Sequence, residues 1–241
     1  MSDGNWLRAQ VIEAHGGLDR WNRFQKVEAE IDSGGGFFRF KSVPLAGPRK
    51  LTVWLHEQRA MIAPIGADGP RAVFKPERVA IEQLDGTVVA ERTNPREAFT
   101  GHQMNTPWDP LHLAYFSGEA LSTYFKTPFL LAKNGVEVEE VEPWLEGNET
   151  WRVLRATFPE TVETHSRVQH FYFGDDLMLR RHDYQVDIAG GFRAAQLVGD
   201  PIEASGIRLP SQRWVYASTA DSQPIFDMLM VSIDISNVKF I

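Results

Sequence analysis

The chain has 241 residues, of which 43% are hydrophobic and 24% charged, and this composition supports a sizeable core in one β-rich domain over residues 1–241. The net charge of −7 argues against nucleic acid as a partner, because a phosphate backbone is bound by a basic face. The absence of cysteine excludes disulfides, zinc–thiolate sites and a cysteine nucleophile.

The first residues, MSDGNWLRAQ, contain no basic segment followed by an apolar one, which is the pattern of an export signal. No stretch of the chain approaches 18 apolar residues. We therefore expect a cytoplasmic location and no insertion into a membrane. The oligomeric state is left open by the sequence.

Helical spacing predicts a short amphipathic helix over residues 3–15, which Gly16-Gly17 ends. From residue 27 apolar and charged residues alternate, so the period becomes that of a half-buried strand. Further strands follow between turns rich in Pro and Gly, as in an antiparallel meander. We predict them at residues 27–31, 37–43, 51–55, 59–62, 71–74, 79–83 and 87–92.

A helical segment over about residues 107–128 interrupts the strands. Asp109 before Pro110 is typical of a helix start, with the acid as cap and the proline at the first helical position. Apolar residues then recur at helical spacing until Pro128. Gly118 weakens the middle of the segment, so two short helices are as compatible with the pattern as one.

Strands resume after Gly135 and continue almost to the end of the chain. A long antiparallel sheet twists and curls, and its concave face must be covered by helices or bind something apolar. We therefore expect a mainly β (α+β) fold, a single curled antiparallel sheet that forms an open half barrel, with an N-terminal helix and a helical plug on the concave side. The strands of this half are predicted at residues 136–141, 149–158, 161–173, 178–188, 192–198, 209–218 and 228–235.

This order of elements resembles the LolA/LolB superfamily of lipoprotein-carrier-like half barrels. The resemblance is carried by the opening helix with Ala14-His15-Gly16-Gly17, the plug-like segment 107–128 and the hairpin series that follows it. An uncharacterised bacterial branch is similar in its Arg180–Tyr184 strand, its Gly190-Gly191 turn and its Gly206–Pro210 approach to a late strand. The violacein enzyme VioE is similar in fold, so the resemblance implies a hydrophobic cavity and leaves both carrier and catalyst open.

The strand Arg180–Tyr184 is the first candidate for chemistry. Alternation places Arg180, His182 and Tyr184 on one face. On the concave side, His182 and Tyr184 could exchange protons with a ligand while Arg180 holds an anionic group. A solvated row of side chains across neighbouring strands explains the same pattern without a function.

A second candidate cluster contains His102, Trp108, Asp109 and His112. Asp109 and His112 are three residues apart and reach one side of a helix start, and a carboxylate raises the pKa of a neighbouring imidazole, as a general base requires. Helix capping alone also explains Asp109. His102 would join His112 only through the fold.

The abundant aromatic residues suggest the wall of a ligand cavity, although such residues are more often simply core. In a half barrel the core and the cavity share one face, so both roles can hold together. The ligand-binding candidates, beside Arg180, are Trp54, Trp108, Tyr115, Phe116, Tyr124 and Trp214.

No cofactor or metal is expected. His165 and His170 are five residues apart and would face opposite sides of a strand, and no metal-binding motif occurs. Gly34-Gly35-Gly36 precedes a predicted strand, whereas a phosphate loop leads into a helix.

Three functions therefore remain open. The first is a cytoplasmic binder or carrier of an apolar small molecule. The second is a cofactor-independent enzyme, a cyclase or isomerase, that uses His182, Tyr184, His102 and His112 for acid–base catalysis. The third is a structural or partner-binding module with a filled core and no cavity under residues 107–128.

Overall fold

A computed structural model describes residues 3–43, 45, 47–65 and 69–241. All of its strands pair antiparallel in one sheet, whose order among the described residues is β6-β5-β4-β3-β2-β1-β13-β12-β11-β10-β9-β8-β7. The strands are β1 (Lys26–Gly34), β2 (Arg49–Trp54), β3 (Arg59–Ala63), β4 (Arg71–Lys75), β5 (Arg78–Glu82), β6 (Val88–Thr93), β7 (Glu137–Glu146), β8 (Glu149–Thr157), β9 (Val168–Phe173), β10 (Leu179–Val186), β11 (Phe192–Ala204), β12 (Ile207–Ser218) and β13 (Pro224–Phe240).

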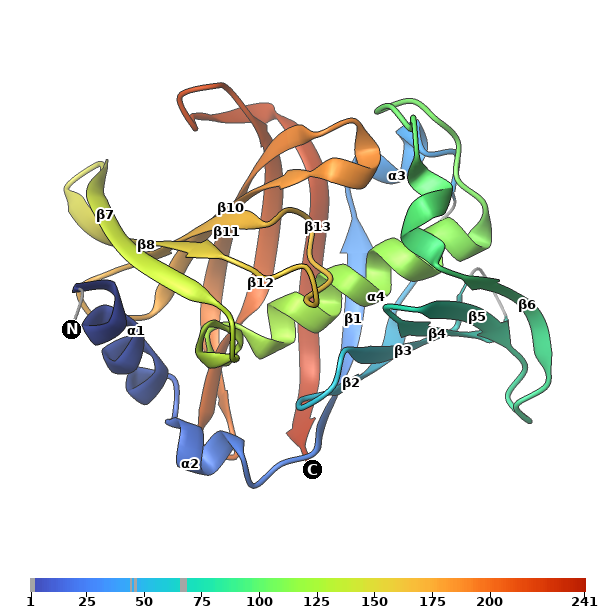
Figure 1. Ribbon diagram of the computed structural model, residues 1–241, viewed down its shortest axis with the longest axis horizontal. Coiled ribbons are helices and arrows are strands. Elements are labelled where there is room, and N and C mark those ends of the chain that lie inside the picture. Colours follow the sequence, from blue (N-terminus) through green and yellow to red (C-terminus); the bar gives the residue numbers. More distant parts are fainter. Residues whose placement is uncertain (1–2, 44, 46, 66–68) are drawn as a thin grey trace.

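The sheet consists of two meanders that meet where β1 pairs with β13, so the first and last strands lie side by side. β6 and β7 are the two edges of the sheet. The segment that links them contains α4 (Pro110–Lys126), which crosses the concave face against β2 to β6 (Figure 1). The expected open half barrel with a helical plug is confirmed.

The remaining helices are short. α1 (Asp3–Ala14) packs against β7 and β8 at the other side of the concave face (Figure 1). Two large apolar clusters result, one under α4 and one under α1. The other helices are α2 (Leu18–Trp21), α3 (Phe37–Phe40) and the 3-10 turns η1 (Pro95–Phe99), η2 (Phe129–Ala132) and η3 (Asp187–Ala189).

Two strand predictions are wrong. Residues 37–40 form α3 instead of a strand, and both Phe37 and Phe38 are buried. The strand predicted over 161–173 begins only at Val168, and the residues before it form an irregular segment that contains His165. The prediction of a single domain over 1–241, which includes residues outside the described ones, stays a prediction.

α4 is one helix, and Gly118 explains how it lies so close to the sheet. A Cβ atom built on Gly118 would lie 2.2 Å from Cβ of Phe74 on β4. The glycine is therefore a close-contact position rather than a break between two helices.

Candidate functional site

The start of α4 is fixed by a capping box. Oδ1 of Asp109 accepts a hydrogen bond from the His112 N–H at 2.8 Å, and the Asp109 N–H donates to Nδ1 of His112 at 3.2 Å. The Asp109 carboxylate also pairs with Arg92 at 2.6 Å, and these contacts lower its pKa against the opposing effect of burial. Capping and an ion pair thus account for Asp109.

A polar chain of side chains is sealed beneath α4. Oε2 of Glu119 lies 2.9 Å from Nδ1 of His165, and these side chains are 0% and 2% exposed. Oη of Tyr124 lies 3.1 Å from Nε2 of His165 and 2.6 Å from Oη of Tyr184. Among the described residues, neither the Glu119 carboxylate oxygens nor Nδ1 of His165 have a hydrogen-bond partner, so this contact is a close approach of two buried polar groups. With the proton of His165 on Nδ1, its Nε2 can accept from Tyr124, and Tyr184 can donate to Tyr124 in turn.

The chain continues onto strands β11 and β12. Gln196 donates to Oη of Tyr184 at 3.3 Å, and Arg213 donates to Oε1 of Gln196 at 2.7 Å and to the Tyr124 carbonyl at 3.0 Å. Burial raises the pKa of Tyr124 and of Tyr184 and lowers that of Arg213 to about 10. Both phenols therefore keep their protons at neutral pH.

His182 lies on the same concave face, but its imidazole contacts a different partner, Gln169. Its Nε2 is 2.6 Å from Oε1 of Gln169, and its ring stacks on Phe171. Burial, and then the charge of Arg213, lower its pKa well below the usual value. His182 is thus a neutral core histidine that donates to an amide.

The space beside this chain is too small for a substrate. The cavity that Phe116, Tyr124, His165 and Tyr184 help to line holds about 30 Å³, roughly the volume of one water molecule in the liquid. A cofactor-independent enzyme that uses Tyr184 and His182 therefore finds no support in this arrangement. The core beside Phe116 and Tyr124 is filled, as the third hypothesis expects there.

His102 and His112 do pack together, with ring centroids 5.0 Å apart, beside Phe99 and Trp108. They lie at the start of α4, whereas Tyr124 lies near its end, about 18 Å away at 1.5 Å per residue. Desolvation, and then the charges of His112 and Lys41, lower the pKa of His102. The predicted acid–base residues therefore belong to two separate clusters.

Arg180 does not join His182 and Tyr184 in one site. The pairing of β10 with β9 shifts between Leu179 and Arg181, so a bulge at Arg180 interrupts the alternation. The Arg180 guanidinium binds Asp176 at 2.9 Å and lines a cavity to which Tyr184 does not contribute. Arg180 thus already has a carboxylate partner.

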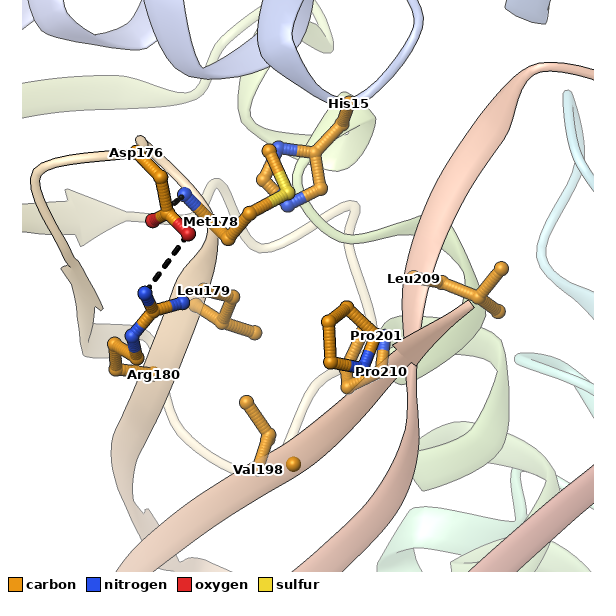
Figure 2. Close-up of a pocket in the computed structure, with 10 residues that line it drawn as sticks. His15, Asp176, Met178, Leu179, Arg180, Val198, Pro201, Leu209 and Pro210 are labelled. Carbon is orange, nitrogen blue, oxygen red and sulfur yellow. Dashed lines mark hydrogen bonds and ion pairs between the residues drawn. The ribbon is translucent and has the colours of Figure 1, made fainter. Parts of the chain in front are cut away.

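That cavity, which we call the α1 cavity, opens on the concave side between the end of α1 and strands β10 to β12. It holds about 270 Å³, close to the lower limit for small-molecule sites. Figure 2 shows its mostly aliphatic walls, with the Asp176–Arg180 pair to one side. It is lined by His15, Asp176, Met178, Leu179, Arg180, Val198, Gly199, Pro201, Leu209 and Pro210.

His15 is the polar group of the α1 cavity that burial keeps neutral. Desolvation lowers its pKa to about 4. Its Nδ1 is 2.8 Å from the Val11 carbonyl, which can only accept, so Nδ1 carries the proton. Nε2 is then a lone-pair acceptor on a ring that helps to line the cavity (Figure 2).

The predicted aromatic wall divides between the two faces of the sheet. Trp54 alternates with the buried Val53, so it lies on the convex face, where Arg59 stacks on it at 3.9 Å. Trp214 likewise alternates with Arg213 and Val215, which face α4. The two tryptophans therefore do not line the concave interior.

The other aromatic candidates are core residues around α4. Trp108 and Phe116 belong to one aromatic cluster, with centroids 5.1 Å apart, and Lys41 lies 4.7 Å above the Trp108 ring. Burial raises the pKa of Tyr115, whose hydroxyl donates to Glu163. Their role as ligand-binding residues stays a prediction.

Sequence reasoning missed Glu119 and His165 as partners. Glu119 follows Tyr115 by four residues and Phe116 by three, so helical spacing already placed a carboxylate on the apolar face of the plug. For His165 there is no local signal, because the sequence pattern over residues 161–173 predicts a single strand. In the sequence, His15 stands out only as part of the Ala14-His15-Gly16-Gly17 segment, which carries the resemblance to the half-barrel superfamily.

No group of three or more His, Cys, Asp or Glu side chains in the described part of the chain could hold a metal ion. Within the same part, none of the helices is both long and apolar enough to span a bilayer.

No model of a known protein family matches the chain, and no curated protein matches it in sequence. Among solved structures, a DUF1329 family protein from Desulfovibrio piger is 12% identical, with a TM-score of 0.57, over 100% of this chain and 94% of its own. A LolA superfamily protein from Nitrosomonas europaea is 10% identical, with a TM-score of 0.48, over 96% of this chain and 92% of its own. The predicted resemblance is confirmed at the level of fold: the chain shares the fold of the Desulfovibrio piger protein, and LolA superfamily structures are among those it is similar to. At 12% and 10% identity, the similarity of this chain to these two structures is a similarity of fold.

Proposed function

We propose that the protein binds an uncharged, largely apolar small molecule in the α1 cavity, as a binder or carrier. The observation that carries the proposal is the lining of this cavity, which consists mainly of aliphatic side chains and two prolines around the neutral ring of His15. Burial of hydrocarbon against such a surface is favourable by about 25 cal/mol per Å². α4 packs over β2 to β6 and α1 over β7 and β8, and the α1 cavity lies between the end of α1 and strands β10 to β12.

The polar groups of the α1 cavity favour a ligand without charge. The Arg180–Asp176 pair is already neutral as a unit, so an anion would compete with Asp176 for the guanidinium. Nε2 of His15 can accept one hydrogen bond, which suits a hydroxyl group. The proposed ligand class is therefore a medium-chain alcohol or a similarly small hydroxylated lipid.

The proposal is tested by titrating the purified protein with decan-1-ol and with decanoate, with binding measured by calorimetry. Decan-1-ol should bind more tightly than decanoate. His15→Phe should weaken the binding of the alcohol about tenfold, the loss of one hydrogen bond of about 1.4 kcal/mol. Equal affinities for alcohol and carboxylate, or wild-type affinity in the His15→Phe variant, would contradict the proposed ligand class.

A cytoplasmic location remains part of the proposal. It is tested by fractionation of the native host, in which the protein should be recovered with cytoplasmic markers, and recovery with the periplasmic or membrane fraction would exclude it.

A further inference from the structure

A second cavity, which we call the lysine cavity, lies where the end of α4 meets η2, α2 and the turn between β2 and β3. It holds about 330 Å³ and is separate from the α1 cavity, with which it shares no lining residue. Its lining residues are Leu18, Trp21, Asn22, Leu55, His56, Glu57, Gln58, Lys126, Phe129, Leu130, Ala132 and Lys133.

Two lysines line this cavity, and neither forms an ion pair with Glu57, the carboxylate that lines it with them. Lys126, the last residue of α4, is 4% exposed, and its Nζ donates to the main-chain carbonyl of Glu57 at 2.6 Å. Within the described residues, neither Lys126 nor Lys133 has an ion-pair partner. The Glu57 carboxylate is paired with Arg59 instead, at 3.7 Å.

The burial of Lys126 beside Lys133 lowers the stability of the protein when no ligand is bound. A buried charge is stabilised by an opposite charge or by hydrogen bonds, and Lys126 has one carbonyl for three N–H donors. Desolvation and then the charge of Lys133 lower the pKa of Lys126 to about 7, while Glu57 acts against them. Desolvation also lowers the pKa of Lys133. A bound anion would relieve both effects.

The lysine cavity is also lined by apolar and aromatic side chains, which we call its aromatic wall. Trp21 and Phe129 stack with centroids 4.2 Å apart and planes at 10° to each other. Leu55 and Leu130 extend the same wall. A ligand that matches this cavity has a charged end and a hydrocarbon body.

We propose that the lysine cavity binds an anionic amphiphile, with a phosphate, sulfonate or carboxylate group between Lys126 and Lys133 and its hydrocarbon against Trp21 and Phe129. This site is independent of the proposed function, because it is a different cavity with the opposite preference for charge.

Calorimetric titration with decanesulfonate tests the site, since the charge of this probe does not vary near neutral pH. Lys126→Met and Lys133→Met should each weaken binding at least tenfold, as expected for loss of one charge-assisted contact of about 1.4 kcal/mol. The matched control is Lys239→Met, because Lys239 is an exposed lysine on β13, and this variant should bind as the wild type does. Val198→Trp in the α1 cavity should also leave the affinity unchanged.

A second measurement separates a charge effect from a structural one. Lys126 is partly neutral above pH 7, so binding at about pH 8.5 should take up protons and be weaker than at about pH 6. The other titratable groups at the cavity are His56, Glu57 and Lys133. Lys126→Met should abolish most of the proton uptake, as seen from titrations in buffers of different ionisation enthalpy.

Three results would overturn the proposal. The first is wild-type affinity in both lysine variants. The second is loss of binding in Val198→Trp, which would place the probe in the α1 cavity. The third is inorganic phosphate binding as tightly as decyl phosphate, which would make the site one for a free anion and remove the role of the aromatic wall.

Discussion

Nδ1 of His165 lies 2.9 Å from Oε2 of Glu119, and α4 seals both side chains from solvent. The pair links the plug to the segment before β9, and Tyr124 extends the link to β10 through Tyr184. A buried polar link of this kind stabilises one position of the helix, because a displaced helix would leave each partner alone in the core.

The pair should therefore be strongly coupled. Removal of one member of a buried pair costs about 3 kcal/mol or more. We expect His165→Leu to lower the free energy of unfolding by about that amount in the wild type and by much less in the Glu119→Leu background. Urea denaturation of the four proteins measures the coupling.

The exposed pair Arg208–Glu203 provides the matched control. The same cycle there should give less than about 1 kcal/mol. Additive effects of Glu119→Leu and His165→Leu would show that the two side chains do not depend on each other.

Gly118 gives a second prediction. In an exposed helix, Gly→Ala is stabilising by about 1 kcal/mol. Here the added methyl group would overlap Phe74, so we expect Gly118→Ala to destabilise the protein by about 2 kcal/mol. Thermal unfolding measures the sign, and a higher melting temperature for Gly118→Ala would contradict the close packing of α4 on β4.

His15 predicts how stability depends on pH. Burial lowers its pKa from 6.5 to about 4, so between these values the unfolded chain binds the proton that the folded chain excludes. Stability should be complete above about pH 6.5 and fall by about 3 kcal/mol as the pH approaches 4. His182 acts in the same direction.

Urea unfolding at about pH 7.5 and pH 4.5 of the wild type and of His15→Gln measures this effect. The variant should lose less stability on acidification, whereas His56→Gln, which changes an exposed histidine, should behave as the wild type. An equal loss in His15→Gln and wild type would show that the imidazole is not held neutral.

The sheet was predictable because its strands carry local signals, namely alternation and turns rich in Gly and Pro. α3 was not, because Phe37-Phe38-Arg39-Phe40 is typical of a strand and only the fold buries both Phe37 and Phe38. Alternation showed that Trp54 and Val53 lie on opposite faces, but which face is concave depends on the curl of the whole sheet.

The candidate site was less predictable for the same reason. His102 and His112 meet through the fold, and their distance from Tyr184 is set by the length of α4 and by which strands it crosses. The bulge at Arg180 shifts the register of β10 against β9 and leaves no mark in the sequence pattern. His165 acquires its partners only when the segment before β9 reaches Glu119.

The most direct test of the central claim fills the α1 cavity and measures the binding of decan-1-ol by calorimetry. Val198→Trp places an indole in the cavity, and Val89→Trp places the same side chain at an exposed position on the edge strand β6. The account predicts at least a tenfold loss of affinity in Val198→Trp and wild-type affinity in Val89→Trp, with both variants folded by circular dichroism. Wild-type affinity in folded Val198→Trp would contradict the claim that the ligand lies in the α1 cavity.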